Sequence, residues 1–137
     1  MEKHDLEFAT VTNDIKVTVT PSYNQQGSNP SQNMHIWFYY VRIENLGRLT
    51  IQVLSRHWQV FDSSGKNEEI KGEGLVGYQP IIKPSEFFEY KSQVRLFSES
   101  GLMQGEYTAV DLDSKQQFSI SIPAFSLDVD IEHLSFN

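Results

Sequence analysis

Apolar and polar residues alternate along many short segments of the chain, which is the period of a β-strand with one buried face. The clearest case is segment 35–45, where Trp37, Tyr39, Val41 and Ile43 are predicted to share the buried face. Seven further segments are predicted as strands: 14–21, 50–61, 67–71, 79–82, 87–96, 106–110 and 118–122. The pattern therefore predicts about eight strands.

Turn-forming residues separate these segments, and glycine, proline, asparagine and aspartate are frequent between them. The alternation changes parity near Ser55 and Arg56, which predicts a β-bulge at that point. Segment 22–33 is polar and aperiodic, so we expect a connecting loop there. Because no segment carries an extended apolar pattern at helical spacing, the expected fold class is all-β, with an antiparallel sandwich or barrel.

The length of 137 residues fits one domain with a single core. All the predicted strands fall within residues 14–127. Residues 1–13 are mixed and charged, so we expect them to form a short N-terminal extension. Residues 128–137 include several acidic side chains and no lysine or arginine, which predicts an acidic C-terminal tail.

The formal net charge is -7 at pH 7, which disfavours binding to nucleic-acid phosphates. The chain has no cysteine, so disulfides and thiolate metal sites are excluded. No apolar run approaches the roughly 18 residues that a membrane span requires, and the first residues do not resemble a signal peptide. We therefore expect a cytoplasmic protein without direct membrane insertion or nucleic-acid partners.

The second face of segment 35–45 carries Phe38 and Tyr40. These two rings need cover, either from a neighbouring strand or loop of the same chain or from a partner protein. An exposed aromatic patch commonly marks an interaction site. Both interpretations stay open at the level of sequence.

Gly72, Gly74 and Gly77 have the spacing of a dinucleotide-binding loop. In such loops the glycines precede a helix whose N-terminus faces the pyrophosphate, but no helical pattern follows Gly77. The glycines therefore serve a sharply bent loop, or they form an anion-binding nest of backbone amides assisted by Lys71 and Arg56.

Arg56, His57 and Trp58 are the most reactive-looking neighbours in the chain. One interpretation is structural, with Trp58 in the core and Arg56 or His57 bonded to carbonyl groups of the glycine block. The other is that these three residues form a binding corner. No serine, aspartate and histidine set has a recognisable catalytic spacing, and the four histidines do not lie at ligand-like spacing. We therefore expect no enzyme activity, metal site or cofactor.

Five ordered motifs carry a resemblance to the ApaG family: RIENLG at 42–47, LSRHW at 54–58, GEGLVG at 72–77 with QP and KP following, GLMQGEY at 101–107, and a block at 118–125 that ends in IPAF. The resemblance covers about 15–127. It implies an immunoglobulin-like or fibronectin-type-III-like sandwich, found alone in bacteria and as an appended module in eukaryotic proteins. It also implies a link to cobalt resistance and magnesium efflux. Tyr78 departs from the family pattern, which often has glutamate there.

Two functional hypotheses follow from these observations. The first is a non-catalytic protein-binding module, monomeric or homodimeric, with Phe38, Tyr40 and Trp58 as anchors. The alternative is a binder or weak hydrolase of pyrophosphate or a dinucleotide polyphosphate. Its candidate ligand-binding residues are Lys71, Gly72, Gly74, Gly77, Arg56 and His57.

Overall fold

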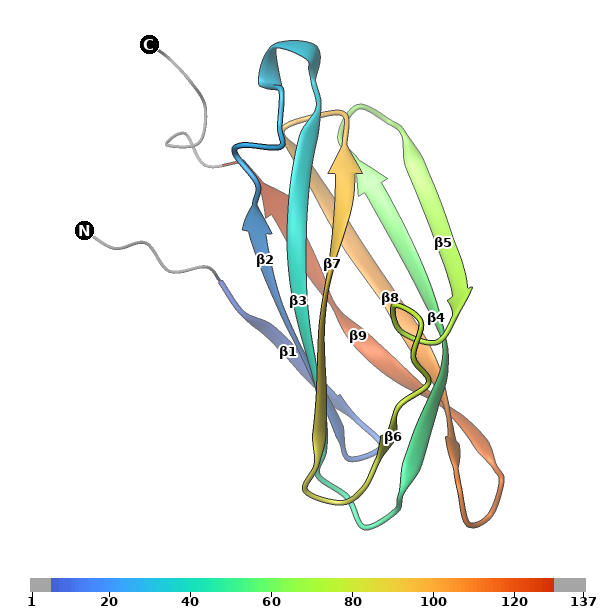
Figure 1. Ribbon diagram of the computed structural model, residues 1–137. Coiled ribbons are helices and arrows are strands. Elements are labelled where there is room, and N and C mark those ends of the chain that lie inside the picture. The colour runs from blue at the N-terminus through green and yellow to red at the C-terminus, as the bar shows by residue number, and fades with distance from the viewer. Residues whose placement is uncertain (1–5, 130–137) are drawn as a thin grey trace, which may run out of the picture.

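The computed structural model describes residues 6–129. Nine strands and one short 3-10 helix follow one another along this part of the chain (Figure 1): β1 (Phe8–Thr12), β2 (Ile15–Tyr23), η1 (Pro30–Gln32), β3 (His35–Asn45), β4 (Ile51–Asp62), β5 (Asn67–Glu73), β6 (Ile81–Ile82), β7 (Phe87–Leu96), β8 (Ser100–Asp111) and β9 (Gln117–Asp128). Among the described residues, no helix is long and apolar enough to cross a membrane.

The strands form two antiparallel sheets that pack face to face (Figure 1). One sheet has the order β1-β2-β3-β7, and the other has the order β5-β4-β8-β9 with β6 paired to β4. On one side β1 and β2 pack against β9, which closes the sandwich there. On the other side, β7 and β5 are the outermost strands that residues 6–129 form. The fold is the expected immunoglobulin-like or fibronectin-type-III-like sandwich, with one closed and one open side.

The core lies between the sheets and is built from the alternating residues. In β2 and β3 every second side chain is buried, as the sequence pattern predicts. At the centre, the ring of Trp58 lies 5.2 Å from that of Tyr39 and 6.0 Å from that of Phe125, measured between centroids. These rings come from three strands in both sheets, so aromatic packing joins the two layers.

The predicted bulge is confirmed, because the pairing of β4 with β8 shifts register between Val53 and Ser55. A second shift, between Met103 and Gly105 in the pairing of β8 with β9, was not predicted. Gly105 leaves no room for a side chain, since a Cβ there would lie 2.2 Å from the carbonyl oxygen of His57. That contact explains why β8 runs through a segment without apolar alternation.

Several boundaries differ from the sequence prediction, among them that of β8, which begins at Ser100 rather than at 106. Strand β1 lies inside the segment 1–13 that was expected to extend ahead of the sandwich, so the described part has nine strands. Its residues pair with β2, and Phe8 packs against Phe125 with ring centroids 6.1 Å apart. The segment 22–33 includes the end of β2 and η1. Of the predicted tail 128–137, Asp128 ends β9, and residues 130–137 lie outside the described residues.

Candidate binding site at the open side of the sandwich

Arg56 holds the glycine-rich loop from inside the sandwich. Its Nη1 donates to the carbonyl oxygens of Glu73, at 3.0 Å, and Gly74, at 2.9 Å. The guanidinium lies against Gly72, where a Cβ would stand 2.7 Å from Nη2. The structural interpretation of Arg56 is therefore correct, and Gly72 provides the space for its side chain.

The loop after β5 closes on itself. Leu75 N–H donates to Tyr78 O at 2.6 Å, and Tyr78 N–H donates to Leu75 O at 3.0 Å. The two residues between them, Val76 and Gly77, have φ angles of 48° and 88°, as in a two-residue hairpin turn. Gly74 N–H is bonded to Leu54 O at 2.7 Å. The amides of Gly74, Leu75 and Tyr78 are thus occupied by carbonyl groups, which leaves few donors for an anion.

The cations proposed to assist this loop do not converge on it. Neighbouring residues of a strand point to opposite faces, so Arg56 faces inward while His57 and Lys71 face outward. His57 Nε2 lies 2.5 Å from Glu69 Oε1, and Lys71 Nζ lies 3.7 Å from the same oxygen. The hydrogen bond from His57 and the charge of Lys71 lower the pKa of the Glu69 carboxyl group.

Buried tyrosines lie next to Arg56. The hydroxyl oxygens of Tyr90 and Tyr107 are 2.5 Å apart, and Tyr107 has no exposed surface. Burial raises the pKa of both hydroxyl groups and of Tyr39, while the charge of Arg56 acts in the opposite direction on all three. This cluster is an internal hydrogen-bonded layer beneath the loop.

The prediction that Trp58 anchors a partner is wrong, because its side chain is 1% exposed and packs in the core. Phe38 and Tyr40 lie on the outer face of β3, as predicted. Tyr40 is 44% exposed, and Phe38 is half-buried. The Nζ atom of Lys91 on β7 lies 4.8 Å from the Phe38 ring centroid and 5.9 Å from that of Tyr40. A neighbouring strand thus supplies part of the cover for the two rings.

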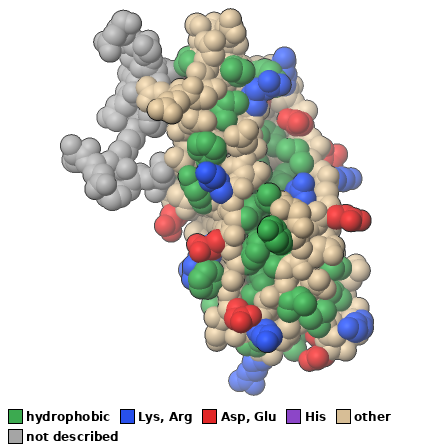
Figure 2. Space-filling model, in the orientation of Figure 1, with side chains coloured by type: hydrophobic (Ala, Val, Ile, Leu, Met, Phe, Trp, Pro, Cys, Tyr) green, Lys and Arg blue, Asp and Glu red, His purple; other side chains and the backbone are tan. Residues whose placement is uncertain are grey.

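Four more large apolar side chains are exposed along residues 76–87, at the open side of the sandwich. Val76, Tyr78, Ile81 and Phe87 are each at least half exposed, with Tyr78 at 65%. These four residues, called here the edge patch, belong to the loop, β6 and the start of β7. Figure 2 shows hydrophobic side chains gathered over this region. The sequence pattern did not predict this patch, although two large apolar residues at a glycine-bounded turn, Val76 and Tyr78, are a signal for it.

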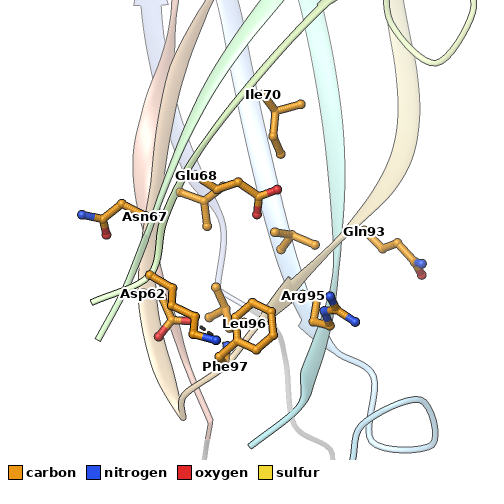
Figure 3. Close-up of a pocket in the computed structure, with 11 residues that line it drawn as sticks. Asp62, Asn67, Glu68, Ile70, Gln93, Arg95, Leu96 and Phe97 are labelled. Atoms are coloured by element: carbon orange, nitrogen blue, oxygen red, sulfur yellow. Dashed lines mark hydrogen bonds between the residues drawn. The ribbon is translucent and has the colours of Figure 1, made fainter. Parts of the chain in front are cut away.

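Above the loop, a groove with a volume of about 390 Å3 separates the open edges of β5 and β7. Figure 3 shows Glu68 and Ile70 on the β5 side, with Gln93 and Arg95 on the β7 side. At one end of the groove lies the ring of Phe97, with Lys66 Nζ at 4.2 Å and Arg95 Cζ at 4.9 Å from its centroid.

Asp62 closes the same end of the groove. It accepts hydrogen bonds from Phe97 N–H at 2.5 Å, from Ser64 N–H at 2.8 Å and from the Ser98 hydroxyl. Burial raises the pKa of its carboxyl group, but these hydrogen bonds outweigh burial and leave the pKa below its ordinary value. Asp62 is therefore a structural anion with its own donors. Within residues 6–129, no group of three or more histidine, aspartate or glutamate side chains is placed to hold a metal ion.

Fold and surface together define a small immunoglobulin-like module with one open side. The chain belongs to the ApaG family, because residues 25–111 match the ApaG domain. A protein named ApaG from Rhodospirillum centenum is 47% identical over 121 residues, which cover 88% of this chain and 92% of the relative. The ApaG protein of Xanthobacter autotrophicus is 44% identical over 122 residues, or 89% and 93% of the two chains.

Solved structures agree with this assignment. A crystal structure described as an ApaA protein from Bordetella pertussis superposes with a TM-score of 0.83 at 39% identity, covering 86% of this chain and 95% of the other. Another X-ray structure, a structural genomics target, gives a TM-score of 0.80 at 31% identity and covers 93% and 97%. None of these names describes an enzyme activity.

Proposed function

We propose that this member of the ApaG family is a non-catalytic module that binds another protein through the edge patch. The observation that carries the proposal is the exposure of Val76, Tyr78, Ile81 and Phe87 on one stretch of chain. Exposed apolar and aromatic side chains that gather at one side of a domain commonly mark an interaction site. Aromatic residues are also the side chains most enriched at the energetic centres of protein interfaces.

The site chemistry supports binding rather than catalysis. Of the described histidines, His57 pairs with Glu69 on an outer face, and His35 is buried against Tyr23. Neither histidine is bonded to a serine or threonine hydroxyl, so neither is arranged to activate one as a nucleophile. The link to cobalt and magnesium that the family resemblance implies would then act through the bound partner.

Tyr78 favours an apolar partner surface. Its ring centroid lies 6.2 Å from that of Phe88, so a partly exposed pair of rings stands where the family resemblance implies a glutamate. An apolar partner surface fits such a pair better than a phosphate does. The alternative, a phosphate ligand at the glycine loop, has less support because Arg56 and three loop amides are already bonded to carbonyl groups.

Quantitative capture of proteins from native cell extract tests the proposal. The immobilised protein is compared with the double variant Tyr78→Ser and Phe87→Ser, and with Leu6→Ser and Val11→Ser as a matched control. Leu6 and Val11 are 71% and 55% exposed and lie just before and on β1, at the opposite edge of the sheet from β7. We expect a specific partner whose recovery falls at least about fivefold with the first double variant only. Equal recovery with both double variants, or no specific partner at all, would contradict the proposal.

A further inference from the structure

The edge of β7 carries backbone groups that no strand uses. Asn45 N–H donates to Glu86 O at 3.0 Å, and Asn45 O accepts from Ser85 N–H at 2.9 Å, so the backbone groups of Asn45 point toward β7. Asn24 N–H donates to Ile36 O at 2.8 Å, so the backbone groups of Ile36 point toward β2. Because these directions alternate along β3, the backbone N–H and C=O groups of its odd-numbered residues point toward β7.

The register of β3 with β7 then assigns the two sides of β7. Opposite the odd-numbered β3 residues lie Phe88, Tyr90, Ser92 and Val94, whose backbone groups bond to β3. The intervening residues turn their N–H and C=O groups away from β3: Glu89, Lys91, Gln93 and Arg95. Among the described residues, no backbone group bonds to this outer side. Such an edge is a template for one more strand.

The groove lies directly beside this edge. Its apolar wall is formed by Val60 and Ile70 from one sheet and by Val94 and Leu96 from the other. A strand added to β7 would direct every second side chain between the sheets, toward this wall. The volume of about 390 Å3 accommodates apolar side chains there.

Charge distinguishes the two faces of such an added strand. Lys66, Lys91 and Arg95 form no ion pair with any described residue, and the ring contacts of these cations are with Phe97, Phe38 and Tyr40. Lys66 and Arg95 line the groove, and Lys91 lies on the outer face of β7 beside Phe38 and Tyr40, in a chain of net charge -7. They attract acidic side chains on the outer face of the added strand, whereas Glu68 on the inner side of β5 disfavours acids in the groove.

The edge of β5 is less suited to accept a strand. Glu68 projects from it into the groove, and Glu69, Lys71 and Glu73 are exposed along it. An inward-pointing charge on an edge strand is a common protection against unwanted pairing. The inner side chains of β7 contain no charge, so β7 is the accepting edge.

We propose that the open edge of β7 accepts an extended partner segment in which acidic and apolar residues alternate. The acidic side chains face Lys91, Arg95 and Lys66, and the apolar ones enter the groove. This proposal rests on the proposed function, since it specifies what kind of partner segment docks beside the edge patch. It places the main-chain contacts on β7 and the apolar anchors on the edge patch and the groove.

Binding of synthetic peptides watched by NMR tests the proposal. The probe is a capped peptide of alternating glutamate and valine, and the control peptide replaces every glutamate by lysine. We expect the glutamate peptide to shift the amide signals of Lys91, Gln93 and Arg95 and to slow their hydrogen exchange. The lysine peptide should bind at least about tenfold more weakly because it meets three cations.

Variants separate edge pairing from general charge attraction. Lys66→Glu with Arg95→Glu should weaken binding at least about tenfold, and Arg48→Glu with Lys115→Glu, the same charge change elsewhere, should weaken it less than about threefold. Gln93→Pro removes an outward N–H while Ser92 and Val94 keep their bonds to β3. It should abolish the protection of the neighbouring amides, provided that the NMR spectrum keeps the folded signals; if it does not, the charge variants decide.

Three outcomes would overturn the proposal: no shift at millimolar peptide, equal binding of both peptides, or shifts confined to another surface. Sedimentation that shows a dimer lost on Gln93→Pro would also overturn it, because the edge would then pair with a second copy. If the peptide fails while capture still depends on Tyr78 and Phe87, the proposed function stands and only this inference fails. If the peptide binds at β7 but capture does not depend on those two residues, the proposed role of the edge patch fails instead.

Discussion

Arg56 Nη1 lies 2.9 Å from the carbonyl oxygen of Gly74, and this contact ties the glycine-rich loop to the interior of the sandwich. The same atom bonds to Glu73 O, so one side chain serves two loop carbonyls. Arg56→Met keeps the length of the side chain but removes its donors. We expect the free energy of unfolding to fall by about 1–3 kcal/mol, measured by urea denaturation. Arg48→Met, at an exposed loop arginine, is the control, and an equal loss in both variants would refute the role of Arg56.

Substitution of Gly74 and of Gly77 distinguishes two causes of lost stability, a steric clash and an unfavourable backbone conformation. Both have positive φ angles, 66° and 88°. A Cβ at position 74 would lie 2.3 Å from Tyr78 O, whereas position 77 has no atom within 4 Å. We expect Gly77→Ala to lower the free energy of unfolding by about 1 kcal/mol, because alanine is strained at a positive φ. Gly74→Ala should lower it by more than about 2 kcal/mol, because the clash adds to that strain. Similar losses on urea denaturation would show that the loop relaxes around the clash.

The buried tyrosines predict a loss of stability at alkaline pH. Burial raises the pKa of Tyr39, Tyr90 and Tyr107 above 10.0 in the folded state, so the fold favours their neutral form. The resulting contribution to the free energy of unfolding is complete below about pH 10, the pKa of tyrosine in the unfolded chain. It is lost as pH rises from there toward the raised pKa values of the folded state. Tyrosinate absorbance should therefore show a class of groups that ionises only as the protein unfolds.

Tyr107→Phe checks this explanation. The variant removes one hydroxyl group with a raised pKa and its hydrogen bond to Tyr90. We expect the free energy of unfolding to fall by about 1 kcal/mol. Tyr78→Phe, at an exposed ring, should change the free energy of unfolding by less than about 0.5 kcal/mol. Ionisation of every tyrosine before unfolding would contradict the burial of the cluster.

His35 predicts a second pH dependence, on the acid side. It is fully buried, Nδ1 lies 2.9 Å from the Tyr23 hydroxyl, and Nε2 has no hydrogen-bond partner among the described residues. Burial lowers its pKa below 6.5, against the smaller opposing charges of Glu99 and Asp62. The unfolded chain then takes up the proton first as pH falls. This contribution to stability is therefore lost from about pH 6.5 downward, toward the lowered folded pKa.

Urea denaturation at a series of pH values measures the contribution of His35. His35→Gln keeps hydrogen-bonding capacity but cannot titrate, so its unfolding midpoint should fall less than that of the unmodified protein between about pH 7 and pH 5. Glu99→Gln removes a charge that raises the pKa of His35, so the pKa of His35 falls further in the folded variant. The loss of stability in this variant should therefore continue to lower pH than in the unmodified protein. An identical pH profile for all three proteins would exclude His35 as the source.

Local patterns predicted the strands well where one face is buried. The alternation of Ile15, Val17 and Val19 and that of 35–45 correspond to β2 and β3. The change of parity near Ser55 also predicted the bulge correctly. These features depend only on neighbouring residues, because the side-chain period of a strand is fixed by its backbone geometry.

Other features depend on contacts between distant segments. Strand β1 forms because Phe8 to Thr12 pair with β2 and pack on β9, which their own weak alternation does not indicate. Strand β8 begins earlier in the chain than predicted, because Gly101 and Gly105 fit closely against backbone atoms of β4. Close backbone approach of this kind leaves no hydrophobic period in the sequence.

For the candidate site, the sequence identified the glycine loop but left a structural role and a binding role open for Arg56, His57 and Trp58. Trp58 is buried because its strand lies between β5 and β8 with its inner face in the core. The sequence by itself thus determined most of the strands, one bulge and the family. Only the tertiary structure decided which edges stay open, that of β7 above all, because strand order arises from pairing between segments far apart in the chain.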